Sequence, residues 1–234
     1  MSVRLASVIL PVYNQADHIR AALEEHVAAL DQLHFDYELL PVINGPRRDN
    51  SLEICRELEK TCGRMRTLCI EQAGWGAAVQ FGLSQADGDL LCFANSARTS
   101  AKDLSLFLVY GSIHRDCVIK ANRRIRESAK RRLASLVYNL ECRMLFDLPY
   151  WDINGTPKVF SRQLAHLRNL KQTGDLIDLE FNVICRDQSY DVLEVPIFSS
   201  SRRTGKSTTN WRSGLRMYWG AFQLRREWMA RKPR

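Results

Sequence analysis

The chain has 234 residues, 45% of them hydrophobic and 26% charged, values that are ordinary for a soluble globular protein of one large domain or two small ones. The formal charge of +8 is unevenly placed: residues 201–234 hold ten Lys and Arg residues and one acid, Glu227, whereas the other 200 residues hold 24 basic and 25 acidic groups. Such a tail suits phosphates, an anionic membrane or nucleic acid, and no apolar run approaches the roughly 20 residues that span a bilayer.

Short apolar runs alternate with helical patterns along the first half of the chain. Strands are predicted at 6–12, 36–43, 66–70, 89–93 and 116–120, and helices at 16–30, 52–61, 75–86 and 102–112. This alternation predicts an α/β fold with a mostly parallel, Rossmann-like central sheet flanked by helices and joined by right-handed crossovers. Pro41, inside the second strand, indicates an edge or an irregular position, because proline cannot donate to a ladder.

The pattern changes after residue 120. A basic run, 120–132, leads into a long helix, 128–146, and one face of this helix carries Leu133, Leu136, Val137, Leu140, Met144 and Leu145. The segments that follow are a loop (149–155), a short strand running into a helix (158–168), a helix (176–186), a strand (190–195), a loop (199–209) and a tail helix (211–230). We therefore expect one domain, 1–210, followed by a basic amphipathic C-terminal helix, 211–234.

A candidate site follows the strand at 89–93, which ends abruptly at Asn95-Ser96-Ala97. Ligands of open α/β sheets lie beyond the carboxyl ends of the strands, so this stretch is expected at the mouth of a cleft. Seven cysteines are scattered without a CxxC pair, which argues against a metal knuckle. No secretory signal is evident, and we expect a reducing, cytoplasmic setting.

Several motifs, in this order, resemble those of one enzyme family. They are Ser7-Val8-Ile9-Leu10-Pro11-Val12-Tyr13-Asn14, Val42-Ile43-Asn44-Gly45 with Asp49-Asn50-Ser51, Gly74-x-Gly76-Ala77-Ala78 with Gly82-Leu83 and Ala86-x-Gly88-Asp89, Asp152-x-x-Gly155, and Glu180 with Glu194-Val195-Pro196 and Arg202-x-x-Gly205-x-Ser207. Over about 5–210 the chain resembles glycosyltransferase family 2 and, within it, the polyprenyl- or dolichyl-phosphate sugar synthases. The resemblance implies a GT-A fold, a UDP- or GDP-linked sugar donor and a polyprenyl phosphate acceptor at the cytoplasmic face of a membrane.

The candidate site residues come from this resemblance and, for Arg98, Arg123 and Lys206, from the cations available to bind phosphate. Those expected to bind the nucleotide sugar are Pro11, Tyr13, Asn14, Asn44, Gly74, Asp89, Asn95, Ala97 and Arg98. Asp152 is the implied catalytic base, or the residue that orients the acceptor, and Arg202 is the second implied catalytic residue. Those expected to bind the acceptor or its phosphate are Arg123, Glu180 and Lys206.

Two departures from the family pattern bear on the metal. The D-x-D motif falls on Asn95-Ser96-Ala97, and the paired acids of the second-strand motif fall on Ile43 and Asn44. Mg²⁺ and Mn²⁺ prefer anionic oxygen ligands, so we expect no metal here, or a weak site through Asn95. Our hypothesis is that cations replace the metal at the diphosphate; the candidates are Arg47, Arg48, Arg98, Arg123, Arg124, Arg202 and Lys206.

Each interpretation has a plainer alternative. The basic run would also suit an ordinary solvated face. The Asp152 carboxylate would suit an Asx-turn with the following backbone, and Asp89 and Glu180 would suit purely structural roles. The tail helix is typical of an interfacial helix at an anionic membrane, but it would equally suit packing on the domain or on a second subunit. The alternative function is a catalytically degenerate nucleotide- or glycan-binding protein. A nucleic-acid partner is disfavoured because no recognised module is present.

Overall fold

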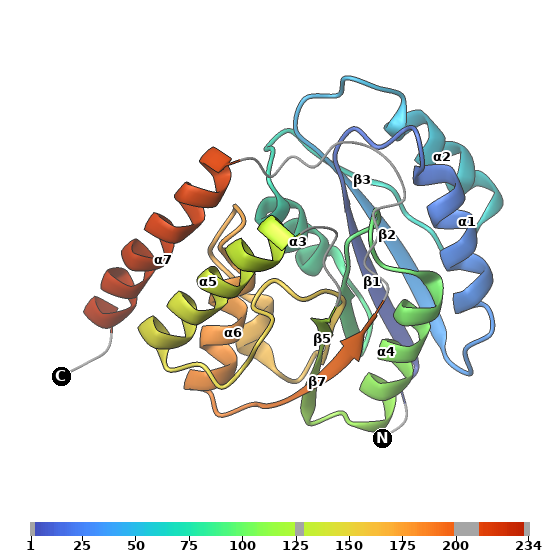
Figure 1. Ribbon diagram of the computed structural model, residues 1–234. Helices are drawn as coiled ribbons and strands as arrows, with labels where there is room; N and C mark the ends of the chain where they lie inside the picture. The colour runs from blue at the N-terminus through green and yellow to red at the C-terminus, as the bar shows by residue number, and fades with distance from the viewer. Residues whose placement is uncertain (1–2, 125–128, 199–210, 232–234) are drawn as a thin grey trace.

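The computed structural model describes residues 3–124, 129–198 and 211–231 (Figure 1). Its strands form one seven-stranded sheet in the order β3-β2-β1-β4-β6-β5-β7. Their bounds are β1 Leu5–Val12, β2 Asp36–Asn44, β3 Leu68–Ile70, β4 Leu90–Phe93, β5 Cys117–Arg123, β6 Lys158–Ser161 and β7 Asp191–Ile197. β6 runs antiparallel to its neighbours β4 and β5, and every other pair is parallel. The predicted mostly parallel sheet is therefore confirmed.

Helices cover both faces of the sheet, as Figure 1 shows. One face is covered by α1 (Ile19–Leu30), α2 (Ser51–Thr61) and α4 (Ala101–Ile113), and the other by α3 (Trp75–Gln85), α5 (Ala129–Phe146), α6 (Ile177–Asp187) and α7 (Trp211–Arg231), with a short 3-10 helix at Ala165–Arg168. Successive strand residues point to opposite faces. β1 accordingly sends Val8 and Leu10 into the α1 side and Ile9 into the α3 side, which gives two hydrophobic cores separated by the sheet.

Pro41 does not mark an edge strand, because β2 lies between β3 and β1. The backbone N–H of Leu39 donates to Arg64 on the β3 side of β2, and residue 41 faces the same side. The β2–β3 ladder begins only at Val42, opposite Leu68. An isolated parallel bridge pairs Leu39 with Met65 in the register of that ladder, so the missing donor of Pro41 falls in the gap between the bridge and the ladder. This gap is the irregular position that the sequence allowed.

The C-terminal helix α7 packs against the domain along one side. Ala221 and Leu224 are buried in the core on the α5–α6 side, and the indole of Trp228 donates to Asp187 (2.5 Å). The opposite side exposes Trp219 and Phe222. In the part of the chain that the structure describes, each helix is too short or too polar to cross a bilayer.

Candidate active site

The six parallel strands of the described sheet end at one edge, and this edge defines the candidate active site. β1, β2, β4 and β5 end there, and the antiparallel strand β6 begins there at Lys158, which lies opposite both Phe93 and Lys120. Ligands of open α/β sheets bind beyond such carboxyl ends. The loops that follow these strands, together with the start of α3, are therefore the segments from which a site would be built.

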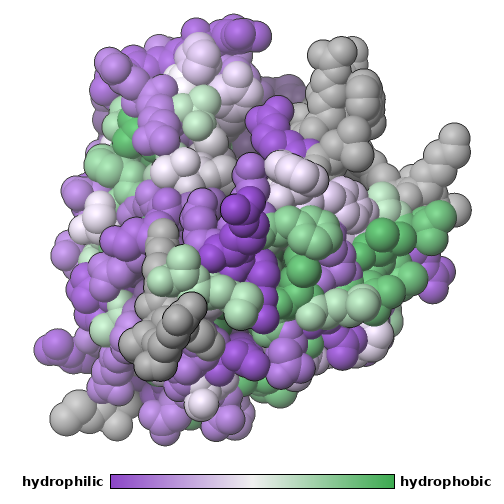
Figure 2. All heavy atoms as spheres, turned by 90° about the vertical axis from the view of Figure 1, so that its left-hand side faces the viewer, coloured by the Kyte–Doolittle hydropathy of each residue, from purple (hydrophilic) through white to green (hydrophobic). Residues whose placement is uncertain are grey.

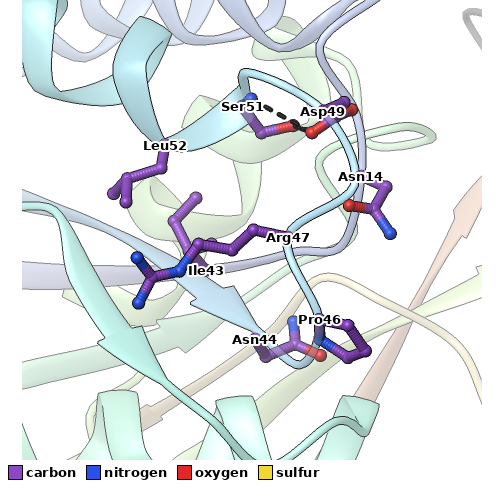
Figure 3. Close-up of a pocket in the computed structure, with 8 residues that line it drawn as sticks. All are labelled: Asn14, Ile43, Asn44, Pro46, Arg47, Asp49, Ser51 and Leu52. Atoms are coloured by element: carbon purple, nitrogen blue, oxygen red, sulfur yellow. Dashed lines mark hydrogen bonds between the residues drawn. The ribbon is translucent and has the colours of Figure 1, made fainter.

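A small hollow lies between the β1–α1 and β2–α2 loops (Figure 3). It encloses about 190 Å³ of empty space, part of which is open to solvent, and it is lined by Asn14, Ile43, Asn44, Pro46, Arg47, Asp49, Ser51 and Leu52. Asp49 and Ser51 fasten the two loops together: the Asp49 carboxylate accepts from the backbone of Ala16 (2.8 Å), and the Ser51 hydroxyl accepts from that of Gln15 (2.8 Å).

Asn14 shapes the rim of this hollow. It adopts a left-handed φ of 48°, which asparagine tolerates better than most residues. Its side-chain Oδ1 accepts from the backbone N–H of Arg48 (2.9 Å). Arg47 lines the hollow, and both it and the next residue, Arg48, are exposed.

Asn44 connects β1, β2 and α3. Its buried side-chain amide donates to the carbonyl of Val12 (2.9 Å), and its Oδ1 accepts from the backbone N–H of Gly74 (3.1 Å). Gly74 has a φ of 143°, and an added Cβ would lie 2.6 Å from the carbonyl oxygen of Thr173. Asn44 therefore fixes the start of α3 at the edge of the site, where only glycine fits at residue 74.

Glu180 holds the loop that covers the start of α3. Its buried carboxylate accepts from the backbone N–H groups of Lys171 (2.8 and 2.9 Å) and Gln172 (2.8 Å). The next residue, Thr173, accepts from the backbone N–H of Ala77 (2.8 Å). Glu180 thus lies near the site and shapes its wall through this loop.

The stretch Asn95-Ser96-Ala97 does not offer a set of metal ligands. The Asn95 side-chain oxygen accepts from the backbone N–H of Ala97 (3.0 Å), and the buried Ser96 hydroxyl donates to Gln15 (2.6 Å). Ala97 carries no oxygen in its side chain. Among the described residues, no group of three His, Cys, Asp or Glu side chains is placed to hold a metal. These neutral, engaged oxygens do not fit Mg²⁺ or Mn²⁺.

Asp152 forms a bidentate ion pair with Arg123. Its Oδ2 accepts from Arg123 Nε (2.7 Å) and from the Arg123 backbone (3.0 Å), and its Oδ1 accepts from Nη2 (2.9 Å). Burial opposes the charge of Arg123, but Asp152 outweighs it and raises the pKa of the guanidinium. Because both carboxylate oxygens are engaged, the geometry favours positioning by Asp152 over proton abstraction.

Behind this pair lies a buried charge network that the sequence analysis did not identify. Lys120 donates to Glu194 (2.9 Å), and Lys158 pairs with Asp178, which also accepts from the Trp75 indole (3.1 Å). Burial lowers the pKa of Lys120, and Glu194 only partly offsets this effect. The sequence did carry a signal for this network, because each of two apolar strand patterns contains a lysine. Burying a lysine charge in a sheet costs free energy unless a carboxylate partner lies nearby.

Asp89 is not part of this edge, and here the expectation from the resemblance is corrected. It precedes β4, so it lies at the opposite edge of the sheet, where its carboxylate accepts from the backbone of Arg4 (3.2 Å). Pro11 is buried and Tyr13 is half-buried at the end of β1, on the correct edge. Arg98 lies there too, after β4, whereas Arg202 and Lys206 fall outside the described residues.

Comparisons with known proteins agree with this geometry. The family model described as glycosyl transferase family 2 matches residues 7–164. Undecaprenyl-phosphate 4-deoxy-4-formamido-L-arabinose transferase of Pseudomonas fluorescens SBW25 is 26% identical over 59% of this chain, and that of strain Pf0-1 is 23% identical over 88%. These matches span only 41% and 60% of the two relatives' own lengths.

Solved structures share the fold at low identity. Glucosyl-3-phosphoglycerate synthase from Mycobacterium tuberculosis, in complex with Mn²⁺, UDP-glucose and phosphoglyceric acid, has a TM-score of 0.73. It is 16% identical, and the match covers 95% of this chain and 79% of that one. The complex of the same enzyme with Mn²⁺, UDP and glucosyl-3-phosphoglycerate has a TM-score of 0.69 at 17% identity. The expected GT-A fold is thereby confirmed.

Proposed function

Because this chain belongs to glycosyl transferase family 2, we propose that it transfers a sugar from a nucleotide-sugar donor to a polyprenyl phosphate. The observation that carries the proposal is the convergence of the β1, β2 and β4 loops on one edge of the sheet, with the start of α3 fixed there by Asn44. The names of the relatives support the acceptor, and the UDP and UDP-glucose held by structural neighbours support the donor class.

In this proposal the donor lies across the carboxyl ends of β1, β2 and β4. Tyr13 and the hollow beside Asn14 and Arg47 would receive the nucleoside. The start of α3, an 11-residue helix, lies at the same edge; since its Ala77 N–H already donates to Thr173, the helix would favour a diphosphate through its dipole and not through that N–H group. We propose Arg98, which follows Asn95 by one turn beyond the carboxyl end of β4, as the cation that neutralises the leaving group.

The acceptor chemistry agrees with the state of Asp152. A sugar hydroxyl needs a base to remove its proton, but a phosphate acceptor is already an anionic nucleophile. Transfer to a phosphate therefore does not require Asp152 to act as a base. In this proposal Asp152 holds Arg123 in place, and Arg123 attracts the acceptor phosphate. We also propose that the enzyme works peripherally at the cytoplasmic face of a membrane; the seven free cysteines fit a reducing compartment.

A nucleotide-binding test addresses the proposal directly. Thermal shifts are measured with UDP, GDP, dTDP and CMP and with the matching nucleotide sugars, each with Mn²⁺ and with EDTA. A ligand at about 100 times its Kd stabilises a protein by about 2.7 kcal/mol, which is easily detected. We expect one nucleotide to raise the melting temperature equally under both conditions, because no metal bridge is needed.

Turnover separates an enzyme from a degenerate binding protein, which the missing D-x-D carboxylates make the second candidate. We expect transfer of labelled sugar to polyprenyl phosphate in EDTA, loss of transfer in Arg98→Ala, and wild-type transfer in Arg64→Ala, a control on the opposite edge of the sheet. A strict Mn²⁺ requirement would contradict cationic replacement. Nucleotide binding without turnover would favour the second candidate.

A further inference from the structure

The outward face of α5 is apolar although no described part of the chain covers it. Tyr138, Cys142 and Phe146 point into the core, while the opposite side exposes a second apolar stripe. Its members are Leu133, Leu136, Val137, Leu140 and Met144, which are between 48% and 77% exposed. This spacing of three and four residues places them on one helical face. A stripe of this kind on a soluble surface marks an interaction site.

α7 extends this stripe. The two helices lie side by side and run in the same direction (Figure 1), joined by the Tyr218 hydroxyl, which donates to the carbonyl of Ala134 (2.6 Å), and by edge-to-face packing of Tyr218 on Tyr138. Trp219, Phe222 and Met229 of α7 are exposed. Figure 2 shows this side of the molecule, where hydrophobic side chains gather beside strongly polar ones.

The charges that border this surface are mostly positive. The described arginines of the two helices are Arg132, Arg143, Arg216, Arg225 and Arg226, and the described acids are Glu141 and Glu227. Helical geometry puts Arg226 on the face of Phe222 and Met229 and turns Glu227 away from it. An apolar band with cationic flanks complements an anionic lipid bilayer: the band enters the acyl boundary and the arginines meet the headgroups.

We infer that α5 and α7 together form a docking platform for an anionic lipid bilayer. This goes beyond an interfacial tail helix, because α5 belongs to the domain and contributes the larger stripe. The inference deepens the proposed function and rests on it for its purpose, since a polyprenyl phosphate is anchored in a membrane. Its geometric basis is independent of nucleotide binding.

The platform is also tied to the loop that carries Asp152. The backbone N–H of Ile153 donates to Asn139 of α5 (3.2 Å), and Arg143 Nε donates to the carbonyl of Leu148 (3.1 Å). The Arg143 guanidinium stacks 4.0 Å from the centre of the half-exposed Trp151 ring. Docking through α5 would therefore hold loop 147–155 at the membrane surface, next to a lipid-borne acceptor.

Vesicle flotation tests the inference. Phosphatidylcholine vesicles with and without phosphatidylglycerol are mixed with the full chain at low salt and at high salt. We expect binding only with the anionic lipid and weaker binding at high salt. Leu136→Glu combined with Leu140→Glu should weaken binding at least about tenfold. The matched control, Leu106→Glu with Ile113→Glu on exposed positions of α4, should bind as the wild type does.

A charge variant and two further readouts make the test decisive. Arg226→Gln should weaken binding about fivefold, and Arg56→Gln on α2 should leave it unchanged. Three results would each overturn the inference. The first is binding to neutral vesicles alone, and the second is an equal loss of binding in the α4 control. The third is a wild-type chain that does not bind vesicles but forms a dimer, which the Leu136→Glu, Leu140→Glu variant dissociates. Thermal shifts with nucleotides in the absence of vesicles report on the proposed function separately, because α5 stripe variants should retain them.

Discussion

At the scale of single residues, the arrangement of charges shows which groups remain available for chemistry. The resemblance names Asp152 as a base, but the carboxylate is 3% exposed and both of its oxygens accept from Arg123. Buried pairs of this geometry are costly to break, because the remaining partner keeps its charge without compensation. The pair is therefore better suited to fix a cation at the site than to take up a proton.

Asp152→Asn tests this interpretation. The variant keeps a hydrogen-bond acceptor but leaves the buried Arg123 charge uncompensated, so we expect a loss of about 3 kcal/mol in the free energy of unfolding, measured in urea. Asp147→Asn, in the same loop but 90% exposed, is the control and should be unchanged. In the transferase assay, the pH profile of residual Asp152→Asn activity should match that of the wild type. Loss of the acidic limb, the fall in activity at low pH, would instead identify Asp152 as the base.

Lys158 offers a second test of the charge network. It is fully buried, pairs with Asp178, donates to the carbonyl of Ile153 (3.2 Å) and lies against the rings of Phe93 and Phe181. Lys158→Met should cost about 3–5 kcal/mol of stability, because Asp178 stays buried without its cation. Adding Asp178→Asn should recover part of that loss, as judged by a double-mutant cycle in urea. Additive losses would show that the two side chains do not act as a pair.

At the scale of elements, local patterns predicted most of the fold, and long-range pairing determined the rest. Nearly every predicted strand and helix lies within a few residues of its observed bounds, because apolar period and turn residues are local signals. The antiparallel direction of β6 and the pairing of Lys158 with Asp178 were missed, since both depend on segments brought together only by folding. Asp89 was misplaced because a four-residue strand separates it from the site edge.

Gly155 shows how a loop depends on close backbone approach. A Cβ at this position would lie 1.8 Å from the carbonyl oxygen of Ala121 on β5, and the Gly155 N–H donates to the carbonyl of Asp152 (3.0 Å). Gly155→Ala should therefore push loop 152–155 away from β5 and cost about 1–3 kcal/mol.

Gly63→Ala is the matched control for this substitution, because nothing lies within 4 Å of its added Cβ. It should change the free energy of unfolding by less than about 0.5 kcal/mol. Urea denaturation of both variants measures the difference, and nucleotide thermal shifts show whether the moved loop disturbs the donor side. Equal stability of the two variants would mean that the loop can shift without cost.

At the scale of the whole molecule, one sheet separates two hydrophobic cores, and each core contains buried cysteines whose reactivity can show when that core opens. Cys55 and Cys92 lie on the α1–α4 side, whereas Cys142 and Cys185 lie on the α5–α6 side. Burial raises the pKa of the thiols of Cys55, Cys142 and Cys185 to about 12, and it also raises that of Cys92. Since the thiolate is the nucleophile, all four should resist alkylation in the folded protein near pH 8.

Alkylation at increasing urea, read by mass spectrometry, then tests how the two layers unfold. The partly exposed Cys62, Cys69 and Cys117 should react first. The four buried thiols should become reactive together, at the midpoint seen by tryptophan fluorescence, because losing either helical layer uncovers the shared sheet. If Cys142 and Cys185 reacted below that midpoint while Cys55 and Cys92 stayed protected, the α5–α6 layer would be opening by itself. The docking platform and loop 147–155 both belong to the α5–α6 layer. If that layer opened alone, the platform and the loop would therefore move together as one unit.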